Sequence, residues 1–314
     1  FTMAEILLSL TIIGVVAAIT LPSLTGNINE RTWNTQRKAL YARFSQAIAL
    51  MPALNGYGTL DDTTDTAAET FVTAGLSKVL KINNICDSEH LGDCGIPKKL
   101  ITAFGENISD FTRSCKTLGG LNSKIYHSDF TQPDTKAAAF ETANGESVLV
   151  FYNPDCVASD VMMIGNSAGA AGGGITGVYA KQQVCANFIF DLNGSKGPNT
   201  VGKDVGMMTV LYPMDSNVVM PLYPKNLSGT YSQVEAAREC SNYDTEYRLP
   251  NIDELLSIYY NRVLVGEELF GSAQYTWSAT KIDSSNSWAF GNSYGMKYSL
   301  DKEDALAALC VKRN

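Results

Sequence analysis

The sequence predicts an α+β protein: a long N-terminal helix packed on an antiparallel β-sheet head, followed by a C-terminal α+β module. Three observations predict this. The chain opens on an apolar and then amphipathic stretch, its middle alternates short apolar runs with turn residues, and its last third combines helix-start signals with aromatic strand-like runs. Short strands joined by turns favour antiparallel pairing, and an amphipathic helix buries its apolar face against such a sheet.

Composition limits the classes of function. Of the 314 residues, 45% are hydrophobic and 18% are charged, which is enough apolar material for a folded core. The formal net charge of −8 makes nucleic-acid binding a poor expectation, because few cations are present to replace the counterions of a phosphate backbone. The only histidines are His90 and His127, and no nucleophile–base order is recognisable, so we do not expect an enzyme.

The first residues read FTMAEILLSLTIIGVVAAITLPSL, and residues 6–21 carry no charge. A helix over residues 1–21 spans about 30 Å, the thickness of the hydrocarbon core of a bilayer. Glu5 precedes the uncharged run, and a carboxylate in an apolar helix is costly unless a cation neutralises it. The amine of Phe1, from the same or a neighbouring chain, would do so. The alternative is an ordinary membrane anchor with Glu5 at the headgroup level.

Phe1, Glu5, Gly14 and Pro22, together with this apolar run, resemble the mature N-terminus of type IV pilins and pseudopilins. The resemblance implies that a prepilin peptidase cleaves before Phe1, that the new amine is methylated, and that Glu5 guides assembly by meeting the amine of a neighbouring subunit. It also implies an inner-membrane protein before assembly by the pilus machinery. Afterwards the chain would form an extracellular homopolymer on the bacterial surface, held through the N-terminal helices.

Residues 1–52 are expected to form the N-terminal helix, apolar over 1–24 and amphipathic over 27–52. Gly14 and Pro22 are weak points, because glycine lowers helix propensity and proline removes a backbone donor. Apolar residues then recur at helical spacing: Ile28, Trp33, Leu40, Phe44, Ile48 and Met51. We interpret this stripe as a face buried under a globular head.

The head is expected to span residues 53–225. Strands are predicted at 148–152, 186–191 and 207–212, and a short helix at 70–80. A glycine-rich run at 165–177 contains G-x-G-x-x-G. It lacks the strand before it and the helix after it that a dinucleotide site requires, so we interpret it as a loop.

The segment DLNGSKGPNTVGKD, residues 191–204, begins like a calcium loop because Asp191, Asn193 and Ser195 alternate oxygen ligands. It departs from the EF-hand pattern at the sixth and twelfth positions, where that pattern has glycine and glutamate. Two interpretations stay open: a Ca²⁺ site that uses Asp191, Asn193 and Asp204, or a turn built from Asn-Gly and Gly-Pro. No other cofactor is expected.

Seven cysteines without a C-x-x-C pair fit disulfides in an oxidising compartment. Cys156 and Cys185 flank the glycine-rich run, and a bond between them would tether its ends. Of Cys86, Cys94 and Cys115, only two can pair with each other. We favour Cys86 with Cys94, because a short loop closes easily. A zinc clip in the same stretch supplies too few ligands.

The last third, residues 226–314, is expected to form the C-terminal module. Residues 231–240 have helical spacing, and Asn251 with Glu254 forms a capping box before a second helix. Strand-like runs follow at 275–280, 287–300 and 305–313.

The order of these segments resembles the Lcl C-terminal domain family, a module of bacterial surface proteins. The matching pieces are Arg248-Leu249-Pro250, Glu254-Leu255, Trp277-Ser278-Ala279-Thr280, Trp288-Ala289, Gly295 and Cys310-Val311-Lys312-Arg313. The resemblance implies a compact lectin-like fold, attachment to a surface glycan or to a host or substrate ligand, and a Cys240–Cys310 disulfide that bridges the ends of the module.

The leading interpretation is a structural subunit of a type IV pilus-like extracellular filament, with an exposed C-terminal module for attachment. The first alternative is a minor pilin or pseudopilin of a secretion or uptake system. The second is a membrane-anchored, lectin-like adhesin.

Overall fold

The parts of the chain that the computed structural model describes are residues 11, 31–51, 53, 66–114, 136–152, 162–163, 178–181, 184–211, 218–219, 224–266, 269–270, 272–292 and 296–312. The chain divides into two compact units, Phe1–Leu40 and Tyr41–Asn314. Among the described residues, no helix is both long and apolar enough to cross a membrane. Most of the apolar stretch 1–24 lies outside the described residues.

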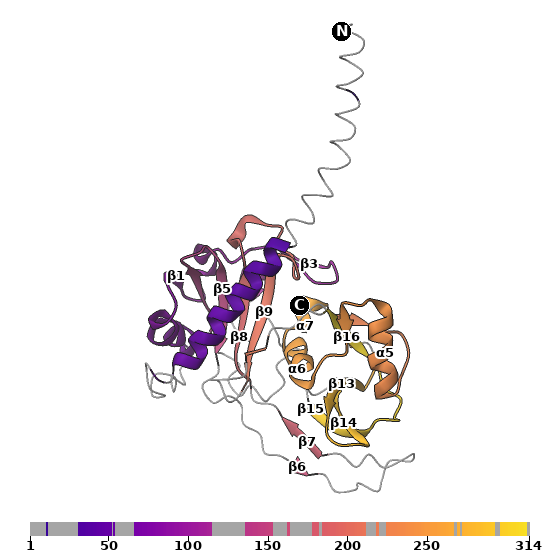
Figure 1. The fold of residues 1–314 in the computed structure, drawn as a ribbon. Coiled ribbons are helices and arrows are strands. Elements are labelled where there is room, and N and C mark those ends of the chain that lie inside the picture. Colours follow the sequence, from indigo (N-terminus) through magenta and orange to yellow (C-terminus); the bar gives the residue numbers. More distant parts are fainter. Residues whose placement is uncertain are drawn as a thin grey trace. The chain divides into compact units, whose positions relative to one another are not determined.

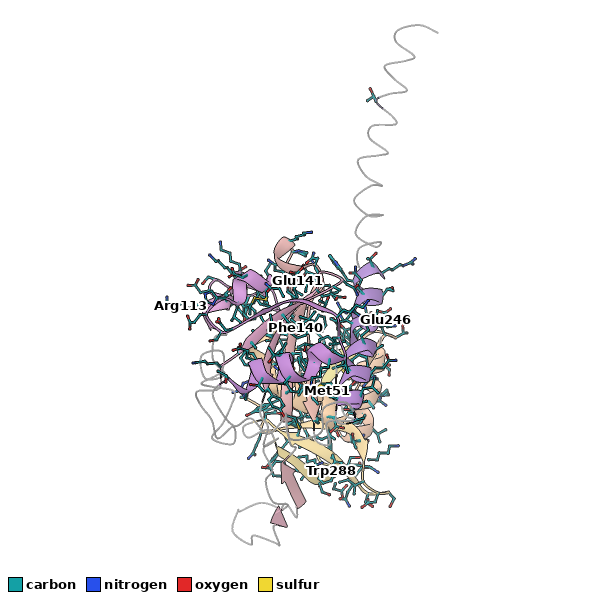
Figure 2. All side chains as sticks on the ribbon, turned by 90° about the vertical axis from the view of Figure 1, so that its left-hand side faces the viewer. Met51, Arg113, Phe140, Glu141, Glu246 and Trp288 are labelled. Carbon is teal, nitrogen blue, oxygen red and sulfur yellow. A yellow bond between two sulfur atoms is a disulfide. The ribbon has the colours of Figure 1, made fainter. Side chains whose placement is uncertain are left out.

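Residues 31–51 are helical, as their amphipathic pattern predicts. The part of this helix in the second unit buries Phe44, Ala47, Ile48 and Met51. The Phe44 ring lies 6.0 Å from the ring of Phe140 and packs edge-on at 5.2 Å from that of Phe188. Figure 1 shows the helix in indigo, and Figure 2 labels Met51 and Phe140. From Phe44 onward, the predicted apolar stripe is therefore a core face.

The described strands form antiparallel sheets (Figure 1). The largest sheet has the order β1 (Ile82–Cys86), β4 (Ala138–Thr142), β5 (Ser147–Tyr152), β8 (Val184–Asp191), β9 (Val205–Leu211), β10 (Val218–Val219). A second sheet has the order β13 (Tyr275–Lys281), β14 (Asn286–Gly291), β15 (Met296–Asp301), β7 (Val178–Lys181), β6 (Met162–Met163). A third has the order β11 (Pro224–Asn226), β16 (Leu309–Lys312), β12 (Tyr247–Arg248). In the fourth, β2 (Leu100–Ile101) pairs with β3 (Asn107–Ile108). The predicted strands at 148–152 and 186–191 are confirmed as β5 and β8, and β9 covers most of the third.

Helices connect these strands. They are α2 (Ala67–Thr70), η2 (Phe71–Gly75), η3 (Leu76–Lys78), η4 (Leu91–Cys94), α3 (Phe111–Ser114), η5 (Gly194–Lys196), α5 (Gln233–Tyr243), α6 (Ile252–Tyr260) and α7 (Arg262–Val265). The helix predicted at 70–80 corresponds to the α2–η3 region, and the two helices predicted for the last third are α5 and α6. The protein is thus α+β, with antiparallel sheets.

The central strands of the largest sheet are buried on both faces. Every residue of β5 and β9 is buried. On one face, Phe188 contacts the rings of Phe44 and Phe71. On the other face, Ile189 and its strand neighbours share a core with residues of α6: Leu149, Phe151, Met207, Leu255, Leu256 and Tyr259. Burial on both faces explains why these strands have nearly continuous apolar sequences.

Polar side chains are also buried where α6 and the turn after it meet the sheet. Asn187 of β8 and Asn261 exchange side-chain amide hydrogen bonds of 2.8 and 3.1 Å. Thr209 of β9 donates to the Asn187 carbonyl oxygen at 2.9 Å, and Ser257 donates to the Thr209 hydroxyl at 2.7 Å. All four residues are at most 2% exposed. The hydrogen bonds fix how α6 lies on the sheet, because any other register would leave buried polar atoms unpaired.

Strand pairing joins residues on both sides of the expected boundary at 225/226. Strand β7 pairs with β15, so residues 178–181 extend the sheet of the C-terminal third. The core shared with α6 crosses the same boundary. The division into residues 1–52, 53–225 and 226–314 stays a prediction, but the second and third segments share a sheet and a core.

The C-terminal third is organised by helix caps and a second core. The capping box predicted at Asn251 and Glu254 is confirmed, and a further one joins Ser232 to Glu235. Arg248 holds both oxygens of the Glu254 carboxylate, at 2.6 and 2.7 Å. Trp277 is fully buried, and its indole N–H donates to the Tyr231 carbonyl at 2.8 Å. It packs in a second core cluster that includes both half-cystines of the Cys240–Cys310 disulfide. The other buried members of this cluster are Ala236, Leu249, Ala289, Leu300 and Ala308.

We expect Asn261→Ala to lower the free energy of unfolding by about 2–4 kcal/mol, because it leaves Asn187 and Thr209 short of buried partners. The matched control is Asn242→Ala, which removes an exposed amide on α5 and should change stability by less than about 0.5 kcal/mol. Urea unfolding of the full chain measures both. Equal losses in the two variants would show that the buried amide network contributes nothing.

Candidate metal site

The loop between β8 and β9 brings together the residues that the sequence singles out as calcium ligands. Asp191 ends β8 opposite Val205, which begins β9. The backbone N–H of Leu192 donates to the Asp204 carbonyl at 2.9 Å and closes the loop at its base. Asp191, Asn193 and Asp204 therefore belong to one tight connection at one end of the largest sheet.

Asp204 shapes this loop. Its side chain is fully buried. One carboxylate oxygen accepts from the backbone N–H of Asn199 and the other from that of Thr200, both at 2.8 Å. A carboxylate holding two amides in this way fixes the backbone of the segment that it spans. Asp204 thus places a buried negative charge inside the loop.

Asp191 is 2% exposed. Its Oδ1 accepts from the backbone N–H of Asn193 at 3.1 Å, whereas its Oδ2 is buried and has no hydrogen-bond partner among the described residues. The side-chain oxygen of Asn193 is likewise unpaired within the described part of the chain, although its amide nitrogen donates to the Gly197 carbonyl at 2.9 Å. Two oxygens in the same turn therefore lack a donor.

The Asp191 carboxylate lies in a poorly solvated environment. Burial raises its pKa to about 7, and the charge of Asp204 acts in the same direction, against the amide of Asn193. Asp191 also lines a small pocket of about 10 Å³ with Pro97, Phe111, Leu149 and other apolar residues. Space of this size admits about one water-sized particle. Among the described residues, no three acidic, histidine or cysteine side chains lie close enough together to hold a metal ion. The oxygen-bearing side chains that the sequence singles out in this loop are the carboxylates of Asp191 and Asp204 and the amide of Asn193.

A serine links the loop to its neighbours. Ser147, at the start of β5, is 1% exposed. A Cβ atom on Gly95 would overlap its hydroxyl oxygen, and a Cβ on Gly194 would come within 3.3 Å of the same atom. Both glycines have positive φ, +76° and +64°. The close approach of two glycines to one side chain packs the end of η4 against the candidate loop.

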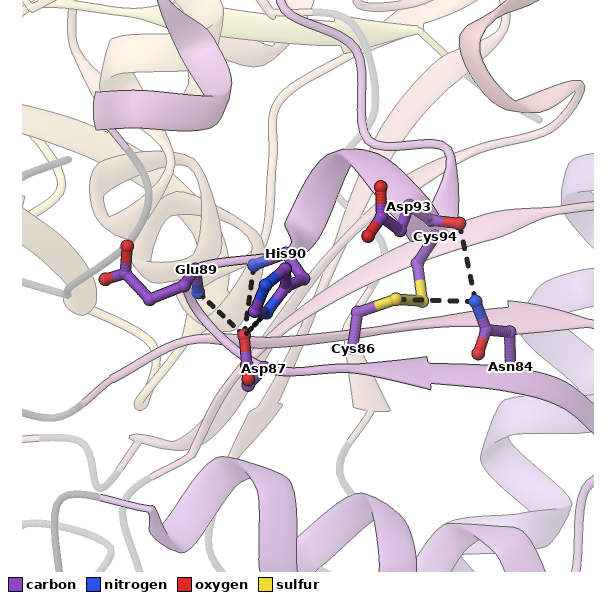
Figure 3. The surroundings of a disulfide bond; sticks show 7 residues. All are labelled: Asn84, Cys86, Asp87, Glu89, His90, Asp93 and Cys94. Atoms are coloured by element: carbon purple, nitrogen blue, oxygen red, sulfur yellow. Dashed lines mark hydrogen bonds and ion pairs between the residues drawn. A yellow bond between two sulfur atoms is a disulfide. The ribbon is translucent and has the colours of Figure 1, made fainter.

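The η4 turn is closed by the Cys86–Cys94 disulfide (Figure 3). Because its sulfurs are bonded to each other, they are not available as zinc ligands. His90 Nδ1 lies 2.8 Å from Asp87, which also accepts the backbone N–H groups of Glu89 and His90. The hydrogen bond between the two side chains lowers the pKa of Asp87 and raises that of His90, and the two backbone N–H groups also lower that of Asp87. The residues around His90 therefore form a hydrogen-bonded turn.

The other sequence-predicted residues fall into two groups. The disulfides Cys86–Cys94 and Cys240–Cys310 are both present, as expected. Cys185 is disulfide-bonded, but its expected partner Cys156 lies outside the described residues. The expected assembly and processing residues, Phe1, Glu5, Gly14 and Pro22, also lie outside them. The sequence analysis did not single out Ser147 or Gly95, since nothing in the chain order signals that their loops meet.

Residues that carry the Lcl resemblance serve packing in this fold. Glu254 belongs to the capping box of α6 and Arg248 pairs with it, Trp277 is in the core, and Cys310 is in a disulfide. No family model and no curated protein matches the chain. The pilin and Lcl resemblances therefore rest on the residues quoted for them.

The raised pKa of Asp191 predicts how stability depends on pH in buffer containing a metal chelator. Between the ordinary value of 3.8 and about 7, the folded state binds a proton that the unfolded state does not, so this group's contribution to stability falls as the pH rises. The stabilisation of Asp191→Asn relative to wild type should be about 2–3 kcal/mol larger at pH 8 than at pH 5.

Urea unfolding at the two pH values measures this difference. The matched control is Asp283→Asn, an exposed turn aspartate whose pKa is lowered by hydrogen bonds to Asn286 and Ser285; it should show no such difference above pH 5. A pH-independent effect of Asp191→Asn would mean that the carboxylate is well solvated in the folded chain.

Gly95→Ala should destabilise the chain about 1–3 kcal/mol more than Gly105→Ala. Both glycines have positive φ, so both variants incur the backbone strain of an L-residue there, but only Gly95 faces Ser147, whereas Gly105 faces open space. The free energies of unfolding decide this, and equal values would indicate that Ser147 moves aside without cost.

Proposed function

We propose that the chain is a structural subunit of a type IV pilus-like extracellular filament that polymerises through its N-terminal helix. The observation that carries this proposal is the N-terminal sequence itself. Sixteen uncharged residues, 6–21, follow a single acidic residue, Glu5, which lies four positions after Phe1. A segment this apolar must be covered by lipid or by copies of itself.

The head fits this role in two ways. Residues Tyr41–Asn314, called the head from here on, form one of the two compact units of the chain. Within this unit, the helix at residues 41–51 buries its apolar face, since Phe44 contacts Phe140 and Phe188. A filament subunit requires a head that folds independently of the apolar segment through which it would polymerise.

Assembly by this route also assigns a purpose to Glu5. In an apolar bundle without water, an unpaired carboxylate costs several kcal/mol, and an ammonium group from an adjacent Phe1 offsets that cost. The pairing would select the axial position of each incoming subunit. The amount of this chain in sheared filaments separates a major subunit, which would dominate, from a minor one.

A specific surface feature favours the membrane-anchored adhesin as a second candidate. On the C-terminal third, Tyr243 is 52% exposed, packs edge-on against Tyr247 at 5.3 Å, and lies under the ammonium of Lys225 at 5.6 Å. An exposed aromatic ring with polar neighbours suits contact with a ligand that has both apolar and hydroxyl groups. A filament subunit could also contact a ligand through this surface. The membrane-anchored adhesin therefore differs from the filament subunit in one observable: it would form no polymer.

We expect Glu5→Ala to reduce filament yield at least about tenfold in the native host while the chain still reaches the membrane, because the change removes the partner of a neighbouring amine and leaves the apolar segment intact. Electron microscopy and shearing yield measure filaments, and immunoblotting of membranes measures the chain. The control is Glu106→Ala, which removes an exposed head carboxylate and should leave the yield unchanged. Normal filaments from Glu5→Ala would refute the assembly role of this residue.

A further inference from the structure

A pocket of about 310 Å³ lies in the head where three segments meet: the helix at residues 41–51, residues 79–81 before β1, and the turn between β4 and β5. Pockets of this size hold small molecules. Two of the residues that line it, Arg43 and Lys81, are cations, and none of its described lining residues is acidic. These residues all belong to the head, so binding here would not depend on filament formation.

Buried hydrogen bonds hold Arg43 in place. Its Nη2 donates to Glu146 Oε1, and the hydroxyl of Thr142 donates to Oε2 of the same carboxylate. The side chain of Glu146 is only 7% exposed, so the carboxylate is fixed and fixes the guanidinium with it. A cation positioned in advance binds an anion with little further loss of conformational freedom. Because Glu146 neutralises Arg43, the net charge of the pocket is that of Lys81.

Lys81 carries a charge that no carboxylate of the described residues balances. Its side chain is exposed and makes no ion pair or hydrogen bond with that part of the chain. Its backbone carbonyl accepts the N–H of Ala143 at 3.0 Å, which joins residues 79–81 to the β4–β5 turn. In that turn, the Thr142 hydroxyl accepts the backbone N–H of Asn144 at 3.3 Å. Backbone contacts therefore fix the two walls of the pocket that contain Lys81 and Asn144.

We propose that this pocket binds a small aliphatic carboxylate that bears hydroxyl groups. One carboxylate balances the charge of Lys81 and lies beside the fixed guanidinium of Arg43, and hydrogen bonds between such charged groups are the strong ones. The side-chain amides of Gln46 and Asn144 line the same pocket. Each amide can both donate to and accept from a hydroxyl group. The lining thus matches a ligand with one negative charge and several hydroxyl groups.

The same lining selects against other small molecules. Val79 and Leu80 add apolar surface, which suits a carbon chain better than a bare inorganic anion. A dianion such as phosphate would exceed the single net charge of the pocket and meet the negative charge of Glu146 behind Arg43. The ammonium group of an amino acid would lie near Lys81, with no acidic side chain among the described lining residues to pair with it.

The test uses gluconate and lactate as probes, each with a matched counterpart, and the full chain in detergent solution at neutral pH. Sorbitol has the hydroxylated chain of gluconate without the carboxylate, and alanine has an ammonium group where lactate has its hydroxyl. Ligand-observed NMR titration should give a Kd of about 1 mM for gluconate, the strength ordinary for a ligand of this size. Sorbitol should bind at least about tenfold more weakly, and lactate should bind more tightly than alanine.

Two variants locate the carboxylate. Lys81→Gln removes the charge of an exposed side chain and keeps its length, so it should weaken gluconate binding at least about tenfold. The matched control Lys78→Gln changes an exposed lysine of η3 that does not line the pocket, and it should bind as wild type does. Asn144→Asp adds a carboxylate to the exposed turn and should abolish gluconate binding by like-charge repulsion.

Three results overturn the proposal. In the first, wild type does not bind gluconate; if Lys81→Gln then also alters self-association, the carboxylate belongs to a second copy of the chain. In the second, sorbitol binds as tightly as gluconate, so the site does not recognise a carboxylate. In the third, Lys81→Gln and Lys78→Gln bind gluconate equally, which places the site elsewhere. Wild type alone gives the first two results, so the test does not depend on a variant folding.

Discussion

Strands β5, β8 and β9 have apolar side chains on both faces, and the rest of the fold depends on covering both. One face receives the helix at residues 41–51 together with Phe71, through the rings of Phe44 and Phe188. The other receives α6 from the last third of the chain. A sheet left open on either face would expose a row of large side chains to water, at about 25 cal/mol for each Å². The helix at residues 41–51 and the C-terminal third are therefore both integral parts of the unit Tyr41–Asn314.

Burial on both faces creates the need for polar specificity. Apolar contacts between α6 and the sheet tolerate sliding, because they are non-directional. The amides of Asn187 and Asn261 do not, since each must meet its partner within hydrogen-bond distance. The hydrogen bond from Ser257 to Thr209 imposes the same distance requirement between α6 itself and a second strand, β9. The buried network converts a general attraction between surfaces into one defined arrangement.

Local features of this fold could be predicted from sequence, and long-range ones could not. The uninterrupted run of β5 and the capping box of Asn251 and Glu254 act within a few residues, so their patterns are visible in the chain. The pairing of β7 with β15 depends on segments that meet only in space. The candidate site shows the same contrast between local and long-range features. The spacing of Asp191, Asn193 and Asp204 in the sequence identifies the loop, but it does not reveal how deeply these side chains are buried. Asp191 and Asp283 both accept backbone hydrogen bonds in turns, yet burial raises the pKa of Asp191, whereas hydrogen bonds from Asn286 and Ser285 lower that of the exposed Asp283.

The position of β16 in its sheet has a consequence for when the chain can fold. This strand, Leu309–Lys312, lies between β11 and β12 and contains Cys310, the partner of Cys240. Its neighbours β11 and β12 are synthesised before it, and β16 is their pairing partner among the described strands, so their sheet cannot form until β16 emerges. Contacts between distant segments form late and slowly. The sheet of β11, β16 and β12 therefore stays open until β16 has been synthesised, a state in which this part of the polypeptide can still pass unfolded through a narrow channel.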